Sequence, residues 1–274
     1  MRSMPHSRRS MHSVLDFAKF KAEGRKISMV TAYDAWSARL VARSQVDAIL
    51  VGDSLAMVMH GHATTLPATV QLMALHTRAV ATSIEGKVLV ADLPFLSCRK
   101  GIPTAMMAVG ALVSSGAQAV KLEGVDGHED VVRHIVESGV PVMGHLGLTP
   151  QSVHQLGGFR VQGRNDAAAE NLIRQAHKLQ DAGCFSIVLE CVPTDLATRI
   201  TRELQLPTIG IGAGPGTDGQ VLVLQDLWGT DPRPSPRFVR RYLEGERVLT
   251  DALDRYDADV KDTRFPGPGE SYCR

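Results

Sequence analysis

The sequence predicts an α/β protein built as a (β/α)8 TIM barrel. Eight short runs rich in Val and Ile recur along the chain, and most segments between them have the apolar spacing of helices. The runs are continuous rather than alternating, which is typical of strands covered on both faces. Strand–helix alternation implies a parallel sheet with right-handed crossovers. Eight such units favour a closed barrel, which typically needs about 250 residues, and the 274 residues of the chain fit one.

The elements are expected in a regular order along the chain. The predicted strands are 27–33, 48–53, 87–95, 119–124, 141–147, 186–192, 207–214 and 220–224. The clearest helix spans 166–182, where apolar residues follow helical spacing and Asn165 or Asp166 can cap the first turn. Several helices are expected to end at a glycine just before the next strand: Gly86, Gly116, Gly139 and Gly183.

An open Rossmann-like sheet is the alternative architecture. The sequence GIGAGPG at 210–216 contains the glycines of a dinucleotide loop, but it follows the seventh predicted strand and precedes no clear helix. We interpret it as a close-approach loop at the mouth of the barrel, where late loops often meet a ligand.

The barrel is expected to be a single domain over 25–262, including C-terminal helices. Residues 1–24 begin with MRSMPHSRRSMHS, which lacks the apolar run of a secretory signal. We expect a flexible or oligomer-contacting arm there, and a transit peptide is the alternative. The Pro- and Gly-containing residues 263–274 are expected to form a loose C-terminal tail.

The composition argues against several classes of function. The chain has 30 basic and 29 acidic side chains and a net charge of +1, so no broad basic field suits nucleic acid or an anionic membrane. No apolar run approaches the roughly 20 residues of a membrane span. The cysteines lack CxxC spacing, which predicts a reduced, cytoplasmic protein. They are Cys98, Cys184, Cys191 and Cys273.

Polar residues cluster where the predicted strands end. In chain order they are Asp53, Ser54, Asp92, Lys121, Glu123, His145 and Glu190. The carboxyl ends of barrel strands converge on one face, which carries the active site in enzymes of this architecture. Residues far apart in sequence are therefore expected to lie close together.

Each of these residues also has a structural alternative. A lone Asp53 or Asp92 could cap a helix or form a turn. Lys121 and Glu123 point to the same side of one strand and could pair with each other. A carboxylate such as Glu190 in an apolar run is costly unless it is used or paired.

Taken together, the acids indicate a metal site. Three or four carboxylates on one barrel rim would repel one another, and oxygen-rich clusters suit a hard cation. Mg²⁺ fits better than Zn²⁺ because no Cys/His cluster has ligand spacing. A 2-oxo acid could bind Mg²⁺ through its keto and carboxylate oxygens, and the metal would then stabilise an enolate.

Eight motifs between about residue 26 and residue 230 narrow the function. They are TAYD (31–34), VGDSLAMVMHGHATTLP (51–67), ADLPF (91–95), VKLEG (120–124), GHLGLTPQSV (144–153), GGFRVQGR (157–164), LECVP (189–193) and IGIGAGPGTDGQVLV (209–223). In this order and spacing the chain resembles the ketopantoate hydroxymethyltransferase family. The departures, Ala56 and Ala63, remove no expected ligand.

The resemblance implies the barrel of the phosphoenolpyruvate/pyruvate superfamily and a role in pantothenate biosynthesis. The implied reaction moves a hydroxymethyl group from 5,10-methylenetetrahydrofolate to 3-methyl-2-oxobutanoate, with Glu190 as the proton acceptor. The implied Mg²⁺ contacts are Asp53, Asp92 and Glu123. The implied substrate contacts are Asp53, Ser54, Asp92, Lys121 and His145. Members of the family assemble as homodecamers of two stacked pentamers.

Some alternatives stay open at this point. A Mg²⁺-dependent C–C lyase or mutase of the same superfamily is one rival, although its typical KKCG loop is missing. A non-catalytic scaffold is another, although it would be expected to lose the acids. Ser54 could cap a turn, His145 could be structural, and His60 and His62 could belong to a loop or line the folate pocket. Cys191 is expected to face the helices and is not proposed as a nucleophile.

Overall fold

A closed eight-stranded parallel barrel forms the larger part of the protein. The computed structural model describes residues 13–232 and 235–272, and the chain divides into two compact units, Met1–Val223 and Leu224–Arg274. In the first unit neighbouring strands pair in chain order and β8 pairs with β1. The strands are β1 (Ile27–Thr31), β2 (Ala48–Val51), β3 (Val88–Asp92), β4 (Ala119–Glu123), β5 (Val142–Gly147), β6 (Ser186–Glu190), β7 (Thr208–Ile211) and β8 (Gly219–Leu222). The predicted fold and all eight predicted strands are confirmed.

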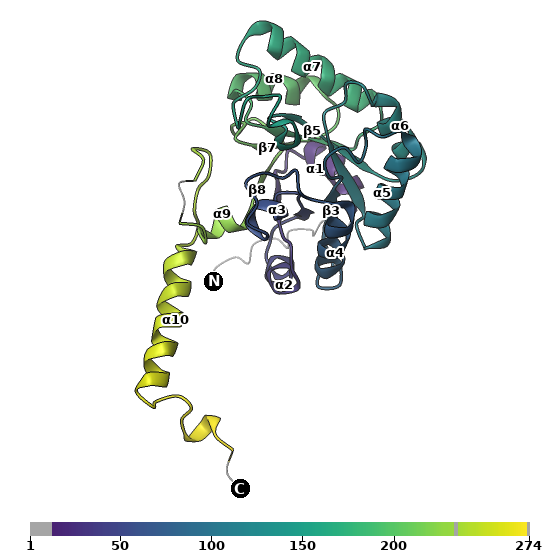
Figure 1. Cartoon of the computed structure of the whole chain (residues 1–274). Helices are drawn as coiled ribbons and strands as arrows, with labels where there is room; N and C mark the ends of the chain where they lie inside the picture. Colours follow the sequence, from purple (N-terminus) through teal and green to yellow (C-terminus); the bar gives the residue numbers. More distant parts are fainter. Residues whose placement is uncertain (1–12, 233–234, 273–274) are drawn as a thin grey trace, which may run out of the picture. The chain divides into compact units, whose positions relative to one another are not determined.

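The longer helices between the strands cover the outside of the barrel, short helical turns lie in the loops, and β7 and β8 are joined without a helix (Figure 1). These helices and turns are α2 (Ala35–Arg43), α3 (Leu55–Val58), α4 (Val70–Ala81), α5 (Ile102–Ser114), α6 (Glu129–Glu137), the 3-10 turn η1 (Pro150–Ser152), α7 (Asp166–Asp181) and α8 (Thr194–Glu203). The predicted cap of α7 is confirmed, because the Asn165 side chain accepts a hydrogen bond from the Ala168 N–H at 2.9 Å. The four predicted stop glycines all have positive φ, between +68° and +108°.

The barrel interior changes from apolar to polar along its strands. Interior positions recur at every second residue of a strand. Near the amino ends they are apolar and form one buried cluster that includes Val88, Val90, Ala119, Met143 and Val188. The same alternation continues, toward the carboxyl ends, to Asp92, Lys121, Glu123, His145 and Glu190. The polar residues are therefore the upper layer of the same interior.

The helix α1 (Leu15–Ala22) belongs to this core as well. Phe17 and Phe20 are fully buried and join the interior cluster, and the Phe17 ring meets the Phe185 ring edge-on at 5.1 Å. Their i, i+3 spacing places both rings on one helix face. The predicted flexible arm over 1–24 is therefore wrong for residues 15–22, whereas residues 1–12 lie outside the described part of the chain.

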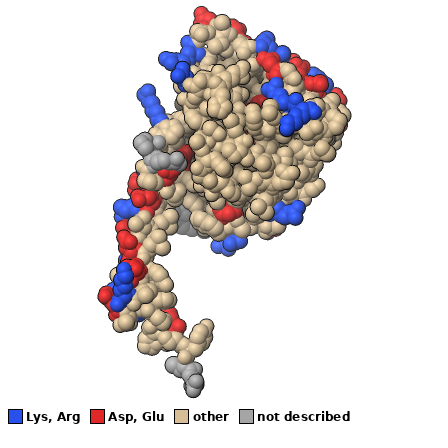
Figure 2. All heavy atoms as spheres, viewed as in Figure 1, with Lys and Arg blue, Asp and Glu red and all other residues tan. Residues whose placement is uncertain are grey.

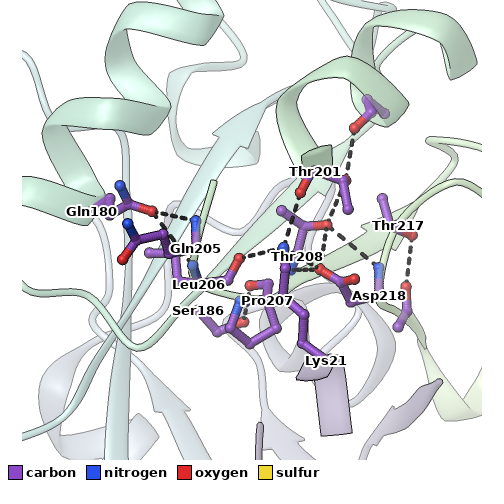
Figure 3. A network of polar contacts seen from close by, with 12 residues as sticks. Lys21, Gln180, Ser186, Thr201, Gln205, Leu206, Pro207, Thr208, Thr217 and Asp218 are labelled. Carbon is purple, nitrogen blue, oxygen red and sulfur yellow. Dashed lines mark hydrogen bonds and ion pairs between the residues drawn. The ribbon is translucent and has the colours of Figure 1, made fainter. Parts of the chain in front are cut away.

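One lysine links α1 to the segments next to β7 and β8, the last two strands of the barrel. The Lys21 ammonium donates to the carbonyl oxygens of Thr201 and Leu206 at 2.9 and 3.0 Å and pairs with Asp218 at 3.0 Å (Figure 3). The same Asp218 oxygen accepts the backbone N–H of Thr208 at 2.9 Å. All three donor positions of the ammonium are used, so the contact joins α1 to the segments that flank β7 and β8.

The second unit is described by itself. It contains α9 (Leu224–Trp228), α10 (Gly245–Lys261) and η2 (Pro268–Glu270). The single domain predicted over 25–262 is thus divided after Val223. The predicted loose tail is partly ordered, because the Phe265 ring packs against Tyr256 at 5.6 Å. Within the described residues, no helix is both long enough and apolar enough to span a membrane.

The lysine contact generates a stability prediction. Lys21→Met removes hydrogen bonds from a charged donor and leaves Asp218 without its ion pair, so the free energy of unfolding should fall by about 2 kcal/mol. Urea unfolding at neutral pH measures the change. Lys19→Met is the matched control on the same helix, since its pair with Glu23 is exposed and 4.0 Å long and should contribute little. Equal effects of the two substitutions would contradict the role assigned to Lys21.

Candidate active site

Two aspartates begin the polar layer. The backbone N–H of Asp53 donates to Asp92 Oδ2 at 3.0 Å, and both residues are buried. Asp92 lies opposite Lys121 in the register of β3 and β4, and the Lys121 ammonium is 3.0 Å from Asp92 Oδ1. The ion-pair partner of Lys121 is therefore Asp92, and the alternative of a pair with Glu123 is not what the structure shows.

His145 lies between two glutamates. It is opposite Glu123 in the register of β4 and β5, and its Nδ1 is 3.4 Å from Glu123 Oε1 and 3.4 Å from Lys121 Nζ. On the other side of the ring, Nε2 is 3.1 Å from Glu190 Oε2, in a charge contact without hydrogen-bond geometry. The Glu190 side chain is 16% exposed, whereas those of the other residues are at most 5% exposed. Glu190 is thus the acid that an entering molecule can reach.

Two residues of the site have no predicted role from the sequence. Gln151 on η1 donates from its side-chain amide to Asp53 Oδ2 at 2.7 Å and from its backbone N–H to Glu123 Oε2 at 2.9 Å. The buried hydroxyl of Tyr33 is 2.8 Å from that of Ser54. Ser54 stands at the N-cap position of α3 but makes no capping hydrogen bond. Gln151 and Tyr33 both lie in motifs that carry the family resemblance. Their place in these motifs is the sequence feature that could have pointed to them.

Burial and like charge shape the electrostatics of the aspartates. Burial raises the pKa of Asp53 well above its usual value, and the negative charges of Asp92 and Glu123 raise it further. Burial also raises the pKa of Asp92, although Lys121 partly opposes that shift. The ionised cluster therefore carries an excess of negative charge in a medium that solvates it poorly.

The two basic groups respond in the opposite direction. Burial would lower the pKa of Lys121, but Asp92, Glu123 and Asp53 raise it above its usual value. Burial and the charge of Lys121 would lower the pKa of His145, but its contacts with Glu123 and Glu190 raise it to about 9. The surrounding acids thus favour the charged form of each group.

The carboxylates suit a hard divalent cation. As they stand, no three His, Cys, Asp or Glu side chains within residues 13–232 and 235–272 are arranged as a ready metal cage. Asp53, Asp92 and Glu123 nevertheless supply carboxylate oxygens. When ionised they repel one another, and the positive charge of Lys121 does not balance their three negative charges. Because Mg²⁺ needs only one or two carboxylates and keeps water in its other positions, these residues fit it.

Other residues singled out in the sequence lie apart from this cluster. His60 is exposed, and its Nε2 is 3.0 Å from that of His76. His62 is also exposed, and neither one joins the acids. Cys191 follows the end of β6 with φ of +48°, and burial together with Glu190 raises the pKa of its thiol to about 11. A thiol that stays protonated at neutral pH is a poor nucleophile, and Cys191 is not proposed as one.

A family model described as ketopantoate hydroxymethyltransferase matches residues 11–268. The chain belongs to this family. A 3-methyl-2-oxobutanoate hydroxymethyltransferase from Coxiella burnetii is 54% identical over 94% of this chain and 97% of that protein. A protein of the same name from Bdellovibrio bacteriovorus is 55% identical over 96% of this chain and 100% of its own length. The resemblance inferred from the motifs is confirmed.

Solved structures support the fold at low sequence identity. A phosphonopyruvate hydrolase in complex with oxalate and Mg²⁺ superposes with a TM-score of 0.62 at 11% identity, covering 95% of this chain and 93% of that one. A 2,3-dimethylmalate lyase of the PEP mutase/isocitrate lyase superfamily has a TM-score of 0.59 at 15% identity, covering 94% and 87%. These likenesses support the barrel fold. The family match, and not these structures, decides for a transferase over the lyase, mutase and scaffold alternatives.

A glycine beside Glu190 generates a prediction for this site. Gly147 lies opposite Glu190 with φ of +92°, and an added Cβ would be 2.2 Å from the Glu190 carbonyl oxygen. Gly147→Ala should therefore lower the free energy of unfolding by about 3 kcal/mol through backbone strain and overpacking, and should displace Glu190.

Urea unfolding and activity measure these two effects. Gly157→Ala is the matched control, because Gly157 has φ of +67° but only a 4.0 Å contact, so strain alone costs about 1 kcal/mol. If Gly147→Ala behaves like the control, the close approach to Glu190 does not constrain the site.

Proposed function

We propose that this enzyme transfers a hydroxymethyl group from 5,10-methylenetetrahydrofolate to 3-methyl-2-oxobutanoate, giving 2-dehydropantoate for pantothenate biosynthesis. The observation that carries the proposal is the position of Glu190, a partly exposed carboxylate beside the buried acids, Lys121 and His145. Proton removal next to a ketone requires a reachable base and a site that accommodates negative charge. The names of the curated relatives agree with this chemistry.

Asp53, Asp92 and Glu123 are the residues proposed to hold Mg²⁺. When bound, the ion would draw charge from the keto and carboxylate oxygens of the oxo acid and so make its C3 proton more acidic. Ser54 would bind the substrate carboxylate. Its hydroxyl does not cap α3, and it can donate to the substrate while it accepts from Tyr33 at 2.8 Å.

Glu190 is proposed to remove the C3 proton of the substrate. His145 would donate a hydrogen bond to the substrate from Nε2, which lies 3.1 Å from Glu190 and makes no hydrogen bond in the structure. Lys121 would contribute a positive charge to the anion that remains. Water releases the methylene carbon from both of its C–N bonds to folate, which gives tetrahydrofolate and a one-carbon unit at the oxidation level of formaldehyde. The carbanionic C3 attacks that carbon and forms the C–C bond, and the carbonyl oxygen takes up the proton held by Glu190 to become the hydroxyl group.

The setting of the reaction is part of the proposal. Cys98, Cys184 and Cys191 are free, which suits a reducing compartment, and we place the reaction in the cytoplasm. The partners are then small molecules, namely the oxo acid and the folate.

Proton exchange tests the proposed base. Wild-type enzyme in D₂O with Mg²⁺ and without folate should exchange the C3 proton of 3-methyl-2-oxobutanoate, as followed by NMR. Glu190→Gln should slow exchange by at least about 100-fold because the base is lost, and EDTA should stop exchange in the wild type until Mg²⁺ is restored.

Glu170→Gln is the control for the loss of one carboxylate, because Glu170 is an exposed acid paired with Arg199. It should exchange at the wild-type rate. Exchange that persists in Glu190→Gln would remove Glu190 from the mechanism. If folded wild-type enzyme exchanges no proton, even with folate added, the assignment of 3-methyl-2-oxobutanoate as the substrate is wrong.

We further propose a homodecamer of two stacked pentamers. Exposed apolar side chains stand on the neighbouring helices α2, α4 and α5 and suit a contact between subunits. They include Trp36, Leu40, Leu75 and Met107. The barrel face seen in Figure 2 carries few charged side chains away from its rim.

Sedimentation should give ten times the chain mass of 29.6 kDa. Met107→Glu should dissociate the assembly by placing a charge in the contact, whereas Leu15→Glu, an equally exposed apolar position on α1, should not. A monomeric wild type would contradict the decamer, and an intact Met107→Glu decamer would contradict this choice of surface.

A further inference from the structure

Gln151 occupies an unusual place for a loop residue. It lies in the short turn η1 after β5, and its side chain reaches across the mouth of the barrel to the segment that follows β2. One residue thereby contacts two carboxylates that come from different strands, Asp53 and Glu123.

The chemistry of its neighbours fixes the orientation of the amide. The side-chain nitrogen is 2.7 Å from Asp53 Oδ2 and 3.0 Å from the carbonyl oxygen of Leu93. Both neighbours only accept hydrogen bonds when the aspartate is ionised, so the NH₂ group must face them and both of its hydrogens are used. The backbone N–H of Gln151 supplies a third donor, to Glu123 Oε2 at 2.9 Å.

These contacts use one oxygen of each carboxylate and leave the other. Asp53 Oδ1 and Glu123 Oε1 are not bonded to Gln151. Glu123 Oε1 has the 3.4 Å contact with His145 Nδ1 and, as a carboxylate oxygen, keeps a second lone pair. The third acid, Asp92, is held separately by Lys121 and by the backbone N–H of Asp53. Gln151 is neutral, so it orients two acids without cancelling the negative charge that attracts a cation, whereas a lysine at this position would cancel part of it.

We propose that Gln151 is a positioning residue of the metal site, which holds one oxygen of Asp53 and one of Glu123 so that their remaining oxygens are available to a divalent cation. This inference rests on the metal site proposed above. Hydrogen-bond partners behind metal ligands typically contribute 10–100-fold to metal affinity, and Gln151 serves two ligands at once.

Direct metal binding tests the inference without recourse to catalysis. Free Mn²⁺ is measured by electron paramagnetic resonance during titration of the full-length protein, and thermal unfolding is recorded in EDTA. Gln151→Met keeps the length of the side chain and removes its two amide donors, whereas the backbone N–H that bonds Glu123 stays. It should weaken Mn²⁺ binding by about 10–100-fold with little change of Tm in EDTA, since the residue is only half-buried.

Two further variants sharpen the test. Gln155→Met makes the same chemical change in the same loop at an exposed residue without contact to the acids, and should bind Mn²⁺ like the wild type. Gln151→Asn keeps the amide but shortens the side chain, so its amide should no longer reach Asp53 and Mn²⁺ binding should again weaken. This second variant decides the matter if Gln151→Met does not fold.

The outcomes separate this inference from the proposed function. Weakened binding in both Gln151 variants, with normal binding in Gln155→Met, supports the positioning role. Unchanged or tighter binding in the Gln151 variants overturns it and leaves the metal site intact. A wild type that binds no Mn²⁺ would overturn the metal assignment itself and the role of Gln151 with it.

Discussion

The two-residue repeat of a β-strand is the constraint on which this molecule depends. Every second residue of each strand points into the barrel, so one set of positions must both fill the core and supply the polar site. Both demands are met because the inward-facing residues change along each strand, from apolar near its amino end to polar near its carboxyl end. Val88 and Val90 fill the lower levels of β3, and Asp92 ends the same strand. The apolar levels exclude water from below and thereby strengthen the charge interactions above them.

That low-dielectric setting explains why the polar residues contact one another so extensively. An isolated buried charge is costly, and the cost falls only when a partner is present. Asp92 has Lys121, and His145 stands between Glu123 and Glu190. The negative excess that remains is the property that would attract the proposed cation.

The sequence predicted the parts of this structure that depend on local pattern. Continuous apolar runs predicted the strands, and acids at the run ends predicted one converging cluster. Features that depend on register or on tertiary packing were not predicted. The choice of Asp92 over Glu123 as the partner of Lys121 follows from strand pairing. Gln151 is an uncharged loop residue, and its only sequence signal is its position in the motif at 144–153. The burial of Phe17 depends on packing against the assembled barrel and cannot be predicted from local pattern.

The lysine that fastens α1 has a consequence for the order in which the protein folds. Lys21 and Asp218 are 197 residues apart in the sequence. During synthesis α1 leaves the ribosome long before β7 and β8, so its two phenylalanines stay without their core until nearly the whole barrel has been made. Contacts of such long range close late and slow the folding of a chain. A nascent chain of this kind would therefore expose apolar surface to chaperones for most of its synthesis.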